Sequence, residues 1–270
     1  MNWRSWRLIL TSVPFALGVV LLAIARRDVF HINPVATLSD IGSVITATVL
    51  ITGFMLAGVL ADHKESERLP NQLTSQLATY LYSLQGMVAV NGAEGSEELR
   101  AAYFRCALSC KNYFVNTGTL DACLTGIDEL NVTATRSPVT QGSGVTNFNK
   151  VAFDCLSKIR ETIGRIETIR QTGFLPTGYS LLRLMVAVAV GLLIFADVKV
   201  NVAQYFITGI VSLVLFVLIR LIADLDDPFD YADGNYEAGS NEVDPYSIVA
   251  FTDSLPAKLD LRSGSVTSRT

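Results

Sequence analysis

The sequence is poor in the side chains on which most enzymes depend. It has two histidines, His31 and His63, and it contains neither a glycine-rich phosphate-binding loop nor a nucleophile elbow. Paired carboxylates occur at 97–98 and 226–227, but no acid, base or nucleophile accompanies them in a recognisable arrangement. We therefore expect the protein not to be an enzyme, and the sequence implies no cofactor.

Cysteine is also scarce, and basic residues are not in excess. The four cysteines, Cys106, Cys110, Cys123 and Cys155, all lie in the middle of the chain, where no histidine is close enough in sequence to complete a zinc site. We expect reduced, buried thiols and no metal. A formal net charge of −4 argues against a nucleic-acid partner, which requires a basic face.

Charge is absent from three long apolar runs, at 8–25, 41–61 and 200–219. Each has about the 20 residues that a helix needs to cross the hydrocarbon core of a bilayer. A fourth run, 184–196, is short by itself, but it becomes a full span when it is counted back through Arg183 to Phe174, because an arginine near a helix end can reach the interface. The sequence therefore predicts an all-α membrane protein with four transmembrane helices in two pairs, and it disfavours a soluble protein with buried helices.

The predicted domains follow from these runs. Residues 1–61 form the first helix pair, at 8–25 and 39–61, and residues 174–223 form the second, at 174–196 and 200–223. Residues 62–173 form a helical domain, in which we expect helices at 69–84, 97–116 and 156–169 and a loop at 131–147. Residues 224–270 hold an acidic Pro-Phe element and a polar tail that either covers a neighbour or is disordered.

The basic residues near the apolar runs predict the orientation of this multi-pass protein. Four crossings put both termini and the helical domain on the same side of the membrane, and the positive-inside rule makes that side the cytosol. Cleavage of the first run as a signal peptide would invert the topology, but its length and the following Arg26 and Arg27 favour an anchor. The flanking basic residues are Arg4, Arg7, Lys64, Arg68, Arg165 and Arg170 on the cytosolic side and Arg26, Arg27 and Lys199 on the other.

Several short motifs, in their order along the chain, resemble the bestrophin family. Gly53-Phe54 in the second crossing is followed by Leu69-Pro70, as in the pore helix of bestrophins and the Leu-Pro beyond it. The acidic Pro-Phe element after the fourth crossing is similar to the one in bestrophins. The residues of the resemblance in the second half of the chain are Gly164, Glu167, Pro176, Tyr179, Arg183, Asp226, Asp227, Pro228 and Phe229.

The resemblance implies a homopentameric channel for small inorganic ions, with chloride as the expected ion, in which the second crossing lines a central pore. The apolar neck of the family falls on Thr46, Leu50 and Phe54, which share one helix face. Thr46 departs from the usual apolar residue, which puts the outer neck in question. A shift of the alignment by one residue selects Ala47, Ile51 and Met55 instead. In a further alternative without a pore, Thr46, Leu50 and Phe54 pack against neighbouring helices within the subunit.

Calcium binding is a weaker implication of the same resemblance. The acidic run that follows Pro-Phe in animal bestrophins is reduced here to Asp230, Asp233 and Glu237, so Asp230 and Asp233 are poor calcium candidates. Two other classes remain open. One is a membrane-anchored scaffold or sensor without a pore, and the other is a membrane enzyme or transporter, which the absence of ionisable residues at mid-membrane disfavours.

Overall fold

The computed structural model describes residues 3–34, 36–171, 176–197, 201–229, 231 and 242–259. Helices dominate these residues, and four of the described helices are long and apolar enough to cross a membrane. The chain divides into two compact units. We call them the membrane unit, which holds the residues up to Lys64 and those from Thr172 to Pro228, and the helical unit, which holds 65–171 and most of the chain after Pro228. The expected all-α membrane fold is confirmed.

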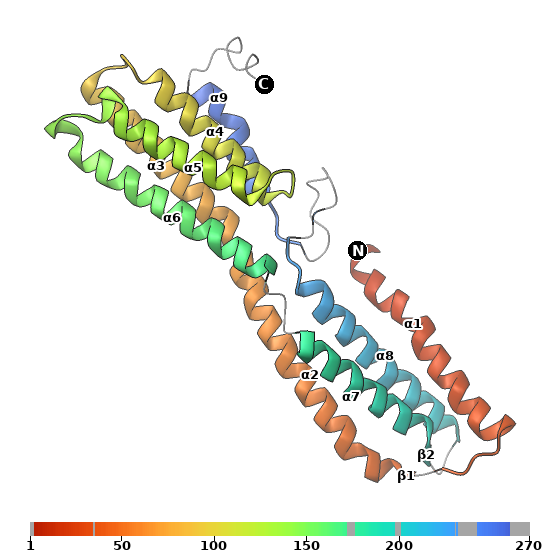
Figure 1. The fold of residues 1–270 in the computed structure, drawn as a ribbon. Coiled ribbons are helices and arrows are strands. Elements are labelled where there is room, and N and C mark those ends of the chain that lie inside the picture. Colours follow the sequence, from red (N-terminus) through yellow and green to blue (C-terminus); the bar gives the residue numbers. More distant parts are fainter. Residues whose placement is uncertain are drawn as a thin grey trace. The chain divides into compact units, whose positions relative to one another are not determined.

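The membrane unit contains the four long apolar helices (Figure 1). A two-residue parallel pairing, with Ala36 opposite Ala196, is a small exception to the all-helical expectation and joins the connection before the second helix to the end of the third. The elements are α1 (Trp3–Ile24), the π-helix η1 (Ala25–Val29), β1 (Ala36–Thr37), α2 (Leu38–Ser66, whose last two residues belong to the helical unit), α7 (Pro176–Ile194), β2 (Ala196–Asp197) and α8 (Asn201–Leu225).

Helix α1 lies along α8, and small side chains let the two backbones approach closely (Figure 1). Ser12 and Ala16 are buried on α1, and a methyl group added at Gly209 of α8 would lie 3.2 Å from Val20 Cγ2. Small residues are typical of helix contacts in membranes, where close packing replaces the hydrophobic driving force. Helix α1 is therefore a packed member of this unit.

Helix α2 contacts the rest of the membrane unit through one face. Met55 and Val59 pack into a cluster with Val186 of α7 and with Leu215 and Ile222 of α8. These residues carry no polar side-chain atoms, so the cluster needs no hydrogen-bond partners within the membrane. The cluster fixes which face of α2 is turned inward.

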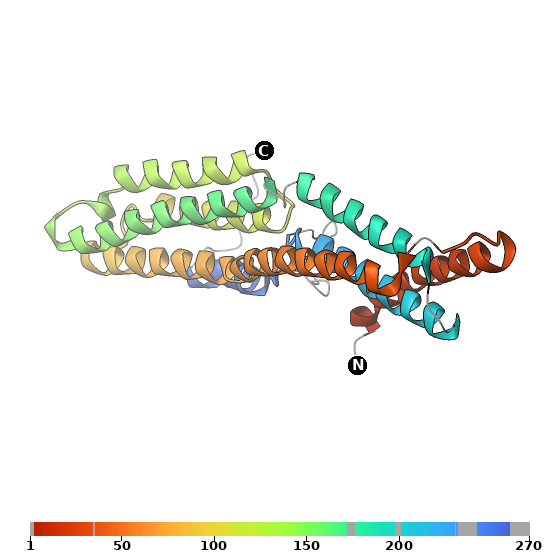
Figure 2. The same ribbon diagram turned by 90° about the horizontal axis from the view of Figure 1, so that it is seen from below.

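The helical unit is a bundle in which α3 lies between α6 and α9 (Figures 1 and 2). Helix α3 follows α2 after a two-residue turn at Glu67 and Arg68. The elements are α3 (Leu69–Asn91), α4 (Glu97–Phe114), α5 (Leu120–Arg136), the 3-10 turns η2 (Pro138–Thr140) and η3 (Ser143–Val145), α6 (Thr146–Gln171) and α9 (Tyr246–Lys258).

Two sequence-based expectations for this unit were wrong in part. The predicted loop at 131–147 begins inside α5, whose first turn is capped by Thr119 and whose apolar positions Ile127 and Leu130 are buried. Within the tail, which was expected to be disordered or to cover a neighbour, residues Tyr246–Lys258 form α9, which packs on α3 and α4 of the same chain. Ile248, Phe251 and Leu255 carry its buried face, and this short pattern was obscured by Pro256 and by the polar residues around it.

Aromatic and thiol side chains fill the centre of the helical unit. Tyr80 and Tyr103 stack with ring centroids 5.3 Å apart, and the Tyr103 hydroxyl donates to the carbonyl oxygen of Leu77 at 2.7 Å. The four cysteines are free and buried, as the sequence predicts, and the sulfurs of Cys110 and Cys123 lie 3.6 Å apart. These side chains are almost completely buried, and among the described residues the Tyr80 hydroxyl, unlike that of Tyr103, has no hydrogen-bond partner.

Truncation in this core should destabilise the protein strongly. Leu73 of α3 is fully buried, so we expect Leu73→Ala to lower the free energy of unfolding by about 2 to 5 kcal/mol, through lost transfer energy and the remaining cavity. The measurement is the thermal unfolding midpoint of the purified chain in detergent. Gln72→Ala, at the exposed neighbouring position, is the matched control and should leave the midpoint nearly unchanged. Equal midpoints for the two variants would contradict the burial of Leu73 in this core.

The buried phenol of Tyr103 should make the fold sensitive to high pH. Burial raises the pKa of Tyr103 well above its ordinary value of 10.0, so its contribution to stability is complete below about pH 10 and is lost as the pH rises through the folded-state pKa. We expect Tyr103→Phe to lose less stability than the wild type between pH 8 and pH 11, measured as the change in unfolding midpoint. Identical losses in the two proteins would show that this phenol is not buried.

Candidate functional site

The predicted neck residues lie on the face of α2 that has no partner within the described part of the subunit. Leu50 is 58% exposed and Phe54 is 70% exposed, and Thr46 is exposed on the same face. Thr48 and Thr52 are fully buried on the opposite face. Because successive helix residues are about 100° apart, the exposed and buried faces point in nearly opposite directions.

The alternative register selects side chains of a different kind. Ala47 is exposed, but Ile51 is half-buried and packs against the cluster formed by α2, α7 and α8, and Met55 is a buried member of that cluster. A residue committed to a core within the subunit cannot also line a shared pore. Of the two registers, the one with Thr46, Leu50 and Phe54 has all three side chains free for an external contact.

The threonines of α2 have their hydroxyl protons satisfied within the helix. Thr46 donates to the carbonyl oxygen of Gly42 at 2.8 Å, and Thr48 and Thr52 likewise donate to carbonyls one turn earlier. This back-bonding is a common solution for hydroxyls in membrane helices, where water is absent. The exposed face therefore presents a phenyl ring, an isobutyl group and, at Thr46, a methyl group with an oxygen that still has acceptor capacity.

The acidic Pro-Phe element begins at the end of α8. The Tyr179 hydroxyl hydrogen-bonds the Asp226 carboxylate and lies 3.4 Å from the carbonyl oxygen of Ile222. The Arg183 guanidinium lies 6.0 Å from the centre of the Tyr179 ring. Three residues of the sequence resemblance, Tyr179, Arg183 and Asp226, are thus neighbours in the membrane unit, while Asp227 is exposed to solvent.

Phe229 is almost completely buried, in the helical unit. Its ring meets Phe114 edge-on at 5.5 Å, and its carbonyl oxygen accepts a hydrogen bond from the Asn116 side chain at 2.8 Å. The Arg170 guanidinium lies 5.4 Å from the Phe229 ring and 4.6 Å from the Tyr113 ring. Phe229 is therefore an anchor for the segment that follows α8.

Glu167 belongs to the same group of side chains. It accepts hydrogen bonds from the Tyr113 hydroxyl and from Gln171, and burial together with the Glu167 contact raises the pKa of Tyr113. Arg170 donates to the last carbonyls of α4, those of Tyr113 at 3.1 Å and Phe114 at 2.7 Å. Sequence reasoning missed Tyr113 and used Arg170 only as a topology marker; an arginine in the last turn of an amphipathic helix was the available signal.

The remaining predicted residues are placed as follows. Pro176 is the first residue of α7, a position that suits its fixed backbone angle and missing N–H. Pro228 is buried next to Phe229. The calcium candidates Asp230 and Asp233 lie outside the described residues, and within the described part of the chain no group of three or more His, Cys, Asp or Glu side chains could hold a metal ion.

Comparison with known proteins finds similar folds among solved structures but no match by sequence. No family model and no curated protein matches the chain. A crystal structure of a variant of the bacterial bestrophin homolog from Klebsiella pneumoniae superposes with a TM-score of 0.73 at 14% identity, over 93% of this chain and 97% of that one. A second structure of the same homolog gives a TM-score of 0.66 at 13% identity, over 94% and 97%.

A crystal structure described as a variant of a membrane protein superposes equally well, with a TM-score of 0.72 at 13% identity over 96% of this chain and 99% of that one. At such low identities the likeness carries information about the fold alone. It extends over both units of the chain, and the distant resemblance that the sequence motifs indicate is confirmed at that level. The protein is an integral membrane protein with the fold of the bacterial bestrophin homologs.

Proposed function

We propose that this protein is a bestrophin-like ion channel, in which five copies of α2 surround a central pore. The observation that carries the proposal is the unpartnered face of α2, formed by Thr46, Leu50 and Phe54, opposite the face that packs inside the subunit. An apolar face in a membrane helix can simply contact lipid. A pore is favoured because the alignment of Gly53-Phe54 with the pore helix of the bestrophin family, made from the sequence, selects the side chains that are exposed on α2.

In the assembled channel, Leu50 and Phe54 form rings of apolar side chains. Such a constriction is gated by dewetting, since a narrow apolar passage holds water poorly until it widens. Thr46 forms the third ring, where its remaining acceptor capacity makes this part of the neck more polar. Conduction requires no ionisable side chain at the neck.

The conducted ion is proposed to be an anion such as chloride, and the helical unit and both termini are proposed to lie in the cytosol. The first assignment rests on the family resemblance, and the second on the positive-inside rule. Two of the basic residues behind the second assignment have structural roles as well. Arg165 forms a two-pronged contact with Glu65, at 2.8 and 2.7 Å, and Arg170 caps α4.

Recording in planar bilayers tests the proposal. We expect the purified protein to give single-channel currents under a salt gradient. Their reversal potential should lie closer to the equilibrium potential of the anion than to that of the cation. Phe54→Ala and Leu50→Ala should raise the current about threefold or more, because the smaller side chain widens the neck and favours its wetting. Leu184→Ala is the matched control, since Leu184 is 61% exposed on α7 and lies outside the proposed pore.

Two outcomes would contradict the channel. If a verified oligomer conducts nothing over a range of calcium, pH and voltage, the protein is better explained as a membrane-anchored scaffold or sensor. If currents appear but Phe54→Ala, Leu50→Ala and Leu184→Ala all behave like the wild type, α2 does not line the pore. A reversal potential closer to the equilibrium potential of the cation would overturn the anion assignment but would still support a pore.

A further inference from the structure

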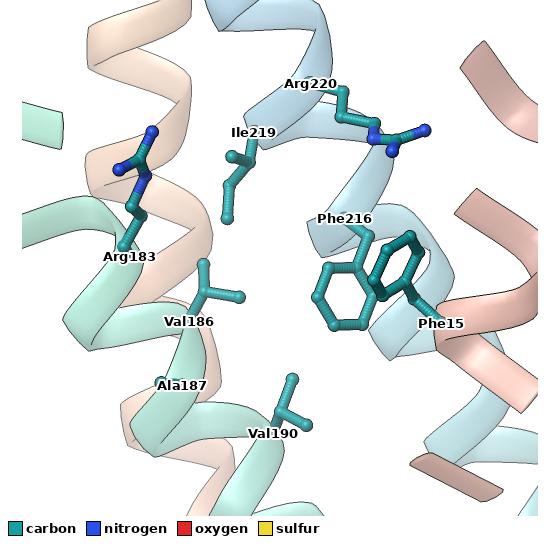
Figure 3. Close-up of a pocket in the computed structure, with 8 residues that line it drawn as sticks. All are labelled: Phe15, Arg183, Val186, Ala187, Val190, Phe216, Ile219 and Arg220. Atoms are coloured by element: carbon teal, nitrogen blue, oxygen red, sulfur yellow. The ribbon is translucent and has the colours of Figure 1, made fainter. Parts of the chain in front are cut away.

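A cavity of about 400 Å³ opens on the membrane unit between α1, α7 and α8 (Figure 3). Its walls are apolar: Phe15 of α1, Val186 and Val190 of α7, and Phe216 and Ile219 of α8. These residues lie inside helices that are apolar enough to span the membrane. Apolar walls at this depth offer water no hydrogen-bond partners, so an apolar chain is the natural filling.

Two arginines stand at one end of this cavity, on neighbouring helices. Arg183 lies about two turns after the start of α7, and Arg220 about one and a half turns before the end of α8. Because α7 and α8 are joined by a short connection and run in opposite directions, both guanidinium groups belong to the same side of the membrane. In Figure 3 both guanidinium groups lie in the upper part of the view, on either side of Ile219, and the other apolar side chains lie below them.

The cavity combines an apolar wall with two basic side chains. Arg220 lies 5.4 Å from the centre of the Phe15 ring, which holds the guanidinium beside the opening. Among the described residues, no salt bridge to either arginine is formed, and none of the side chains that line the cavity is acidic. Guanidinium groups bind phosphate oxygens in a matching two-pronged geometry.

A second copy of this chain is a poor match for the arginine end of the cavity. Among the described side chains of the long membrane helices, carboxylates lie near helix ends, as do Asp62 of α2 and Asp224 of α8, and the sequence of α1 contains none. A neighbouring copy that packs here through the charge-free part of a membrane helix would bring apolar surface to the two cations, and leaving those charges without an anion is costly. An amphipathic anion satisfies both parts of the site.

We propose that the cavity is a binding site for an anionic phospholipid, with the phosphate at Arg183 and Arg220 and an acyl chain against Phe15, Val190 and Phe216. Basic pockets between transmembrane helices are a known way of holding such headgroups. The site is separate from the α2 face and does not depend on whether the protein conducts ions. Asp224 lies one turn beyond Arg220, toward the end of α8. Because its carboxylate repels a phosphate, we place the phosphate on the cavity side of Arg220.

Native mass spectrometry of the purified full-length oligomer tests the site, with phosphatidylglycerol and phosphatidylcholine as probes in the same detergent. We expect the wild type to bind phosphatidylglycerol more tightly. Each of Arg183→Gln and Arg220→Gln should weaken phosphatidylglycerol binding by about fivefold, which corresponds to about 1 kcal/mol per basic residue. Arg27→Gln removes a cation from η1, outside the cavity, and should leave the preference unchanged.

A second pair of variants tests the apolar wall without changing charge. Ala187→Trp fills the cavity from α7 and should reduce binding of both lipids, whereas Val188→Trp adds the same bulk at the adjacent exposed position, outside the cavity, and should not.

Equal affinity of the wild type for the two lipids, or a preference that survives the double arginine substitution, would overturn the proposal. So would dissociation of a lipid-free oligomer by Ala187→Trp, which would make a neighbouring copy the occupant.

Discussion

The absence of water inside the bilayer is the constraint on which the rest of the membrane unit depends. Backbone N–H and C=O groups must be satisfied within the spanning segment, so each apolar run becomes a helix. The same constraint extends to side chains. Thr48 and Thr52 are fully buried in α2, and each donates its hydroxyl proton to a carbonyl one turn earlier, so that they are accommodated without an external partner.

This constraint also shapes how the membrane helices meet. Burial of apolar surface stabilises nothing where the surroundings are equally apolar, so α1 and α8 associate through small side chains and close backbones near Gly209. Helix α2 is held through Met55 and Val59 on one side only. Its opposite side, with Leu50 and Phe54, is left for lipid or for other subunits, and the proposed pore uses that side.

The helical unit follows the rules of a water-soluble core. Its apolar faces drive assembly, and Arg170 links several of its parts because one guanidinium contacts two aromatic rings and also donates to the final carbonyls of α4. Phe229, one of those rings, brings the segment after α8 into this core. The acidic Pro-Phe motif thus has different surroundings along its length: Asp226 interacts with Tyr179 of α7, whereas Phe229 is an anchor among α4 and α6 side chains.

The sequence by itself determined the four membrane helices and the identity of the motif residues, because long uncharged runs and local spacing carry that information. It narrowed the face of α2 to two registers one residue apart, and only the packing of Met55 and Ile51 inside the subunit separated them. It did not determine α9, whose buried face at Ile248, Phe251 and Leu255 gains its stability only by packing on α3 and α4. It also gave no sign that Tyr113 meets Glu167 or that Arg183 and Arg220 share a cavity. Those contacts join residues far apart in the chain, and only the packing of helices against one another brings them together.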